Sequence, residues 1–270
     1  MFGDGAITDE HVVKVLRPFV RGTRPVLQAL RESDPFGLRQ RMQDGEADDD
    51  AERGLFANPK DTVLDWVSTV QVPGTPAWAA MGADQRTDWW VGRVGRFVAL
   101  LAAVPGIGGA LADRLPVQDA LGAAGQGLLL TAIAGEHGID DEDDQIRLLA
   151  AVLFQRDVDG VLARPGDHEQ DQREAERRSA ELTAELEEAQ RKHGRFTVRA
   201  IATTVWRMGR MLWSLGDELG KRPQGRWYHK ALGMLPVVGM AGDYLGERSA
   251  LGKVAAAARR WMAEHPAIRE

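Results

Sequence analysis

Apolar residues along this chain recur mainly every three or four positions, which is the spacing of one face of an α-helix. The clearest run covers 196–219, where Val, Ile, Met and Leu fall on one side of a helix. Alternating runs, which are typical of half-buried strands, are scarce. Similar apolar runs predict further helices over 9–31, 85–104, 116–137 and 140–155, and an Ala-rich helix that ends near Pro266. The pattern therefore predicts an all-α multi-helix bundle.

Local residue types indicate where some of these helices begin and break. Thr8 is a candidate N-cap for the first helix, and Asp140 is a candidate N-cap for the helix over 140–155. The acidic residues that follow Asp140, including Glu142, suit the positive end of the dipole of that helix. Pro18 and Pro25 lie inside the first apolar run, where a proline would kink or divide a helix. A short helix is also predicted over 61–70.

Two uncharged stretches of 16 residues, Phe97–Ala112 and Ala120–Gly135, carry many Gly and Ala residues. Crossing a bilayer takes about 20 apolar residues, so both stretches are short for that role. Small residues let helices approach closely, and we expect these stretches to be buried core helices. A re-entrant or interfacial pair of segments is the alternative.

Polar segments suggest how the chain is divided. Residues 43–52 carry six acidic residues and no basic residue, which predicts a flexible acidic linker over 35–60 after an N-terminal helical segment over 1–34. Residues 61–264 then form the main helical domain. Within it, 164–195 is almost wholly charged, Gln or Ala, and we expect an inserted, solvated helical hairpin arm that could also bind a protein partner.

Composition excludes several kinds of chemistry. The chain has no cysteine, which removes disulfides, thiolate metal sites and cysteine nucleophiles. No zinc-binding or calcium-binding spacing is present, and we expect neither a metal nor another cofactor. The N-terminal segment MFGDGAITDEHVVKVL lacks the basic and apolar regions of a secretory signal, so we expect a cytoplasmic protein that can associate with a membrane periphery.

The net charge of −6 hides a strong asymmetry. Residues 191–270 hold fifteen Lys and Arg against six Asp and Glu, whereas residues 1–190 hold 19 against 34. Such a division indicates either an anionic partner for the basic part or contact between the two parts of the chain.

Tryptophan and arginine occur together in three places. Trp89 and Trp90 lie near Arg86, Arg93 and Arg96, and similar groups follow in the basic part. These residue types are typical of helices at a membrane surface, where Arg meets lipid phosphate, but they also suit core packing or, less well, nucleic acid. The candidates for contact with an anionic surface are Arg199, Arg207, Arg210, Lys221, Arg222, Arg226, Trp227 and Lys230.

Catalytic signatures are weak. GIGG at 106–109 follows no predicted strand and does not complete a nucleotide-binding motif, and no GxSxG or HExxH is present. His137 lies beside Glu136 and could work as an acid or base. Any hydrolytic site would have to be assembled from scattered residues, and its candidates are His137, Asp113 and Asp243.

One part of the chain resembles the EcsC family. The segment 104–155 contains VPGIGG, ADRLPVQDAL and QGLLLTAIAGEHGIDDEDDQIRLLAAVLF, and LPVVGMAGDYLG at 235–246 is similar to the family's second apolar segment. The resemblance covers 85–160 and 196–262, with His137 at a turn position where the family usually has Tyr.

The resemblance implies a helical protein that works beside a membrane transport system, because the family's namesake is encoded with an ABC-type transporter. A hydrolase role has been suggested for the family, without agreed catalytic residues. The sequence thus leaves three hypotheses: a non-enzymatic factor binding an anionic membrane surface or a transport or secretion system, a hydrolase, or a scaffold that binds a partner through 164–195.

Overall fold

The computed structural model describes residues 8–31, 73, 76–102, 117–163, 168–194, 196–220 and 243–269, and these residues form helices and turns without a strand. The helices are α1 (Asp9–Arg31), α5 (Pro76–Ala79), α6 (Ala83–Ala102), α7 (Val117–Glu136), α8 (Glu142–Phe154), α9 (Asp159–Leu162), α10 (His168–His193), α11 (Val198–Gly220) and α13 (Asp243–Glu264), followed by the 3-10 turn η2 (Pro266–Arg269). The predicted all-α multi-helix bundle is confirmed.

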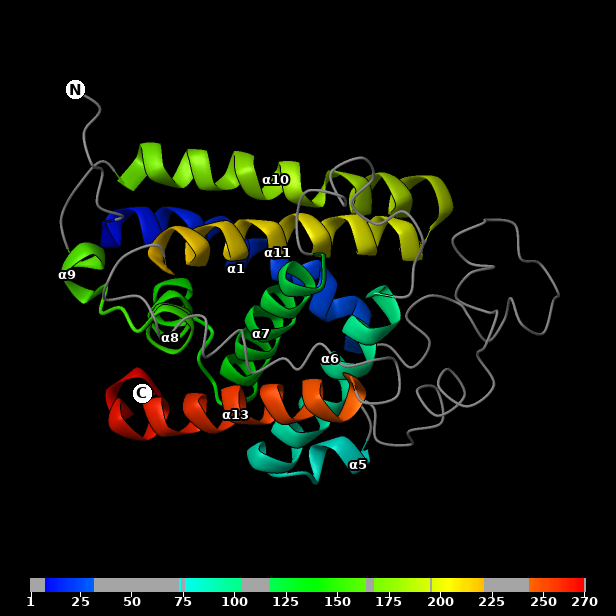
Figure 1. The fold of residues 1–270 in the computed structure, drawn as a ribbon, viewed down its shortest axis with the longest axis horizontal. Coiled ribbons are helices and arrows are strands. Elements are labelled where there is room, and N and C mark those ends of the chain that lie inside the picture. The colour runs from blue at the N-terminus through cyan, green and yellow to red at the C-terminus, as the bar shows by residue number, and fades with distance from the viewer. Residues whose placement is uncertain are drawn as a thin grey trace, which may run out of the picture.

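Helix α7 is the centre of the bundle. It lies between α11 on one side and α13 on the other, and it also packs against α1, α6 and α8 (Figure 1). From Ala120 to Ala134 every side chain or glycine of α7 is buried. The prediction that this uncharged stretch is a core helix is therefore confirmed, and among the described residues no helix has the length and apolar character needed to cross a bilayer.

Glycines on α7 and α11 allow the closest packing in the core. A Cβ added to Gly209 of α11 would lie 2.0 Å from the carbonyl oxygen of Ala120 on α7. A Cβ added to Gly127 of α7 would lie 2.4 Å from the ring of Phe19 on α1. Small residues at these positions thus bring α1, α7 and α11 together.

Helix α1 is part of this core, although the sequence suggested a separate N-terminal segment. It packs against α8, α10 and α11 and buries Leu16, Phe19 and Val20 completely. Thr8 caps it as predicted, because its hydroxyl accepts a hydrogen bond of 3.2 Å from the backbone N–H of His11. Of the two effects predicted for Pro18 and Pro25, a kink or a division of the helix, the division is wrong, since the helix is continuous through both prolines.

Two further expectations change. Asp141, and not Asp140, is the N-cap of α8, and its carboxylate accepts hydrogen bonds from the N–H groups of Asp143 and Asp144 at 2.9 and 3.1 Å. The charged segment does not form a hairpin of its own. Its described part is the single helix α10, which lies along α1 and α11 and buries Leu186 against them (Figure 1). The predicted linker over 35–60 and the predicted helix over 61–70 lie outside the described residues.

Candidate anion-binding surface

The turn between α10 and α11 is flanked by exposed basic side chains. Helix α10 ends in Arg191, Lys192 and His193, and basic side chains are favoured there by the negative end of the helix dipole. Gly194 follows with a positive φ of 67°, which reverses the chain at low steric cost. Thr197 then caps α11 by accepting a hydrogen bond from the N–H of Ala200 at 3.2 Å.

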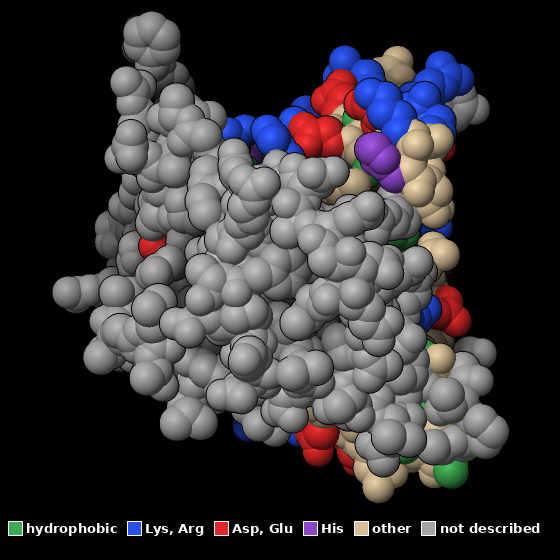
Figure 2. Space-filling view, turned by 90° about the vertical axis from the view of Figure 1, so that its right-hand side faces the viewer, with side chains coloured by type: hydrophobic (Ala, Val, Ile, Leu, Met, Phe, Trp, Pro, Cys, Tyr) green, Lys and Arg blue, Asp and Glu red, His purple; other side chains and the backbone are tan. Residues whose placement is uncertain are grey.

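We name the side chains of Arg191, Lys192, His193 and Arg199 the basic tip. All four are exposed. Lys192 forms an ion pair of 2.5 Å with Glu188, whereas no described residue forms an ion pair with Arg191 or Arg199. Figure 2 faces this end of the molecule and shows Lys and Arg side chains gathered beside a His at the upper corner, next to acidic side chains. The tip can therefore offer guanidinium groups to an anion without first breaking an ion pair.

The residues that the sequence predicted for contact with an anionic surface do not all lie at the basic tip. Arg199 belongs to the basic tip, and Arg210 is exposed further along α11. Arg207 instead binds Glu185 of α10 at 2.6 Å, which ties the two helices together. The remaining candidates lie outside the described residues: Lys221, Arg222, Arg226, Trp227 and Lys230.

The basic part of the sequence does not form one basic surface among the described residues. Helices α11 and α13 lie on opposite sides of α7, so the exposed cations Lys253 and Arg260 of α13 are remote from the basic tip (Figure 1). Arg259 of α13 lies 3.6 Å from Asp84 and from Asp88 of α6. Some of the basic residues after residue 190 therefore form ion pairs with acidic residues of the first part of the chain. Contact between the two parts was one of the two explanations that the sequence offered for the charge asymmetry.

The first tryptophan group is a core structure. Trp78, Trp89 and Trp90 are buried and form two edge-to-face contacts, with centroid distances of 4.9 and 5.0 Å. Arg93 is 1% exposed, and its Nε donates to the carbonyl oxygen of Leu30 at 2.9 Å, so it caps the C-terminus of α1. Burial, with a smaller effect of the nearby Arg96, lowers the pKa of Arg93 to about 10. Trp89 and Trp90 therefore do not face a membrane.

A buried carboxylate joins this tryptophan group to the end of α7. The side chain of Glu136 is 8% exposed and accepts a hydrogen bond of 3.1 Å from Nε1 of Trp90. Arg86 approaches it at 3.4 Å and Arg31 at 3.9 Å. The contacts join α1, α6 and α7, and we interpret Glu136 as a structural residue.

The three catalytic candidates are not brought together by the described part of the structure. His137 is half-buried, and its Nε2 lies 3.4 Å from Oγ1 of Thr87, which is completely buried. Asp113 lies outside the described residues. Asp243 begins α13, where only the backbone is described. No described group of three or more His, Asp and Glu side chains could hold a metal ion.

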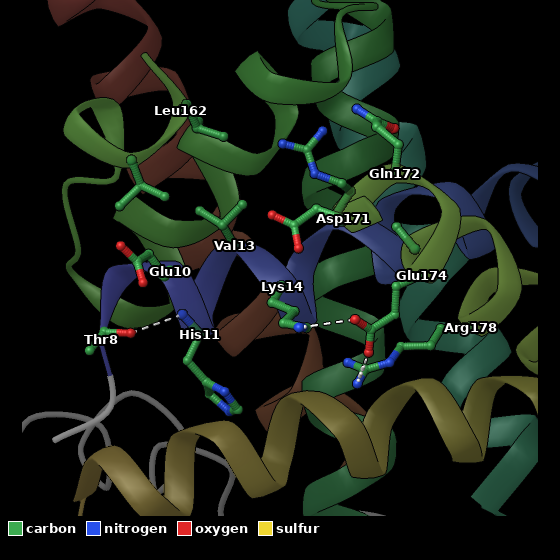
Figure 3. Close-up of a pocket in the computed structure, with 13 residues that line it drawn as sticks. Thr8, Glu10, His11, Val13, Lys14, Leu162, Asp171, Gln172, Glu174 and Arg178 are labelled. Carbon is green, nitrogen blue, oxygen red and sulfur yellow. Dashed lines mark hydrogen bonds and ion pairs between the residues drawn. The ribbon is translucent and has the colours of Figure 1, made fainter. Parts of the chain in front are cut away.

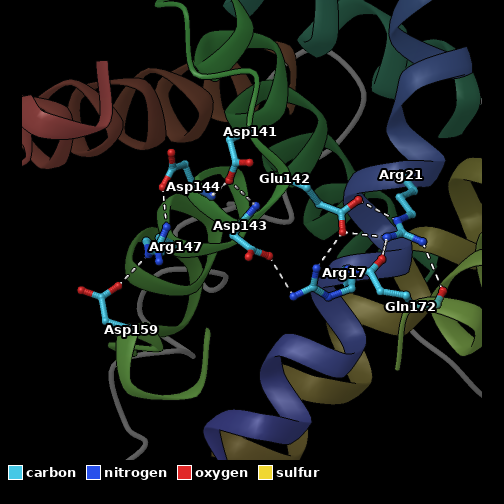
Figure 4. A network of polar contacts seen from close by, with 9 residues as sticks. All are labelled: Arg17, Arg21, Asp141, Glu142, Asp143, Asp144, Arg147, Asp159 and Gln172. Carbon is cyan, nitrogen blue, oxygen red and sulfur yellow. Dashed lines mark hydrogen bonds and ion pairs between the residues drawn. The ribbon is translucent and has the colours of Figure 1, made fainter. Parts of the chain in front are cut away.

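The acidic residues at the start of α8 bind arginines that are distant in the sequence. Glu142 accepts hydrogen bonds from Arg17 at 2.8 Å and from Arg21 at 2.6 and 3.0 Å (Figure 4). Arg17 also lies 2.8 Å from Asp143, and the guanidinium of Arg21 also donates a hydrogen bond to the side-chain oxygen of Gln172 on α10. This network connects α1, α8 and α10, and the sequence indicated it only as a favourable charge for the helix dipole.

Arg191, Lys192 and His193 were not among the residues predicted for an anionic surface. The signal was present, because RKHGRFTVR at 191–199 contains four Lys and Arg, one His and no acidic residue. Comparison with known proteins adds no assignment: no family model, no curated protein and no solved structure matches the chain.

Proposed function

We propose that this chain is an EcsC-like, non-enzymatic protein that binds an anionic membrane surface through its basic tip and works beside a transport or secretion system. The observation that carries the proposal is the exposure of Arg191 and Arg199 without an ion-pair partner among the described residues. Each Lys or Arg held near an anionic leaflet contributes about 1 kcal/mol of binding. Arg210 and the basic residues over 221–230 extend the same chemistry along the sequence.

We favour anionic lipid over nucleic acid as the ligand of the basic tip because the nearby tryptophan rings are not exposed. Single-stranded nucleic acid is usually bound by exposed rings that stack on bases. In the described part of the basic region, Trp206 is buried and Trp213 is half-buried against the core. Among the described residues, the basic tip has no exposed Trp, Tyr or Phe side chain on which bases could stack, so its charge suits lipid phosphate and carboxylate groups better.

Charge reversal at the tip tests this proposal. We expect Arg191→Glu with Arg199→Glu to lower the affinity for vesicles of phosphatidylserine and phosphatidylcholine at least thirtyfold, because two attractive charges are lost and two repulsive ones appear. Co-sedimentation at about 0.1 M salt measures the affinity, and higher salt should weaken binding of the unaltered protein.

The matched control is Lys253→Glu with Arg260→Glu, which makes the same change of net charge on exposed residues of α13. This variant should lose much less affinity. Equal losses in the two variants would show that net charge, and not the tip, determines binding. Equal binding to vesicles of phosphatidylcholine alone would contradict the proposal altogether.

A further inference from the structure

A cleft of about 350 Å³ lies between the beginning of α1, the short helix α9 and the first half of α10. Val13 and Leu162 lie at one end of it and provide an apolar wall (Figure 3), and Val161 and Ala175 are also among its lining residues. Small-molecule sites commonly have volumes of about 300 Å³ or more and combine apolar walls with a few polar groups. The volume of the cleft is near the lower limit of this range, and its apolar wall can contact an acyl chain.

Two cations and one carboxylate lie at the other end of the cleft. Lys14 of α1 binds one oxygen of Glu174 at 2.9 Å, and Arg178 binds the other oxygen at 2.6 Å (Figure 3). Lys14 and Arg178 remain 44% and 38% exposed, so solvent and solutes can reach both. The hydrogen bond from Lys14, with the charge of Arg178, holds the pKa of Glu174 below its usual range.

The other charged groups of the lining limit where an anion can bind. Arg17 is already held by Glu142 and Asp143 of α8. Glu10 and Asp171 also line the cleft and would repel an anion beside them. A ligand carboxylate is therefore directed to the end that Lys14 and Arg178 form, where Glu174 now sits.

We propose that this cleft binds a single-chain carboxylate amphiphile, with its carboxylate between Lys14 and Arg178 in place of Glu174 and its chain against Val13 and Leu162. The side chain of Glu174 then acts as an internal competitor, which occupies the cation pair when no ligand is bound. The inference does not depend on membrane binding by the basic tip, because the ligand is a dissolved molecule and the cleft lies at the opposite end of α10.

Binding of dodecanoate to the full chain tests the inference. Isothermal titration calorimetry below the micellar concentration should show about tenfold tighter binding to Glu174→Gln than to the unaltered protein, because the competing charge is removed. Glu181→Gln is the matched control, since it removes one exposed carboxylate from the same helix away from the cleft. It should leave the affinity unchanged. Lys14→Met should weaken binding about tenfold through the loss of a charge-assisted hydrogen bond.

Carboxylates of increasing acyl-chain length, measured with the unaltered protein, test the inference even where a variant fails to fold. Affinity should rise from acetate to octanoate to dodecanoate, by up to about fourfold for each methylene that becomes buried. Dodecanol should bind more weakly than dodecanoate. The inference is overturned if Glu174→Gln binds no more tightly than Glu181→Gln, if acetate binds as well as dodecanoate, or if dodecanol equals dodecanoate.

Discussion

Replacing Gly209 by alanine is expected to lower the free energy of unfolding by about 3 kcal/mol, although alanine is the better helix former. The new Cβ would lie 2.0 Å from the carbonyl oxygen and 2.7 Å from the carbonyl carbon of Ala120. Both atoms belong to the backbone of α7, so no side-chain rotation can relieve the contact. Helices α7 and α11 would have to move apart at the centre of the core, and urea denaturation followed by circular dichroism measures the loss.

Gly92→Ala is the control for this substitution. Gly92 also lies inside a helix, α6, but a Cβ added there meets no atom within 4 Å. Here the helix preference of alanine should dominate and raise stability by about 0.5–1 kcal/mol. If Gly209→Ala lowers the free energy of unfolding and Gly92→Ala raises it, the close crossing of α7 and α11 is established. A neutral or stabilising Gly209→Ala would show that these helices do not pack as closely as described.

Removing the charge of Glu142 should have a comparable effect. Glu142→Gln keeps the shape of the side chain but leaves Arg17, which is 9% exposed, and Arg21, which is 17% exposed, with much less compensation. Breaking a buried ion pair by removing one partner costs about 3–5 kcal/mol. Because Asp143 still pairs with Arg17, we expect a loss of about 3 kcal/mol in the free energy of unfolding.

Asp140→Asn makes the same change of charge two residues earlier, at an exposed side chain. It should alter the free energy of unfolding by less than about 0.5 kcal/mol. If both variants unfold at the same urea concentration, Glu142 acts only through the general negative charge at the start of α8. The network that joins α1 to α8 would then contribute little to stability.

The helices were predictable because their apolar residues repeat at helical spacing. The predicted range 116–137 agrees with α7 to within one residue at each end, and 196–219 agrees with α11 to within two. Such spacing reports which side of a helix is buried, and it does not report what that side meets. The sequence therefore could not show that α1 joins the central core or that α10 lies along α1 and α11.

Roles of charged residues were harder to predict, because they depend on partners far away in the chain. Arg93 resembled an arginine at a membrane surface beside Trp89 and Trp90, yet it caps the end of α1 from a completely buried position. Glu142 resembled a residue that favours the helix dipole, yet it binds arginines 125 and 121 positions away. Long-range partners of this kind leave no regular spacing that a single sequence could reveal.

The sequence predicted that the candidate surface binds an anion, but it did not predict which of the basic residues form that surface. The excess of basic residues after residue 190 indicated an anionic partner, but the structure divides those residues among the basic tip, ion pairs with α6 and α10, and the far side of α13. Arg207 illustrates the difficulty. By sequence spacing it lies on the same side of the helix as Arg199 and Arg210, but in the structure it forms an ion pair with Glu185 of α10.

The central claim, that the basic tip faces an anionic membrane, is tested most directly by single fluorescent labels. The chain has no cysteine, so His193→Cys and Ala256→Cys each give one labelling site, the first at the tip and the second on the exposed side of α13. On addition of phosphatidylserine vesicles we expect a blue shift of the emission at position 193 only, with reversal at high salt. Equal shifts at both positions, or none at 193, would contradict the account.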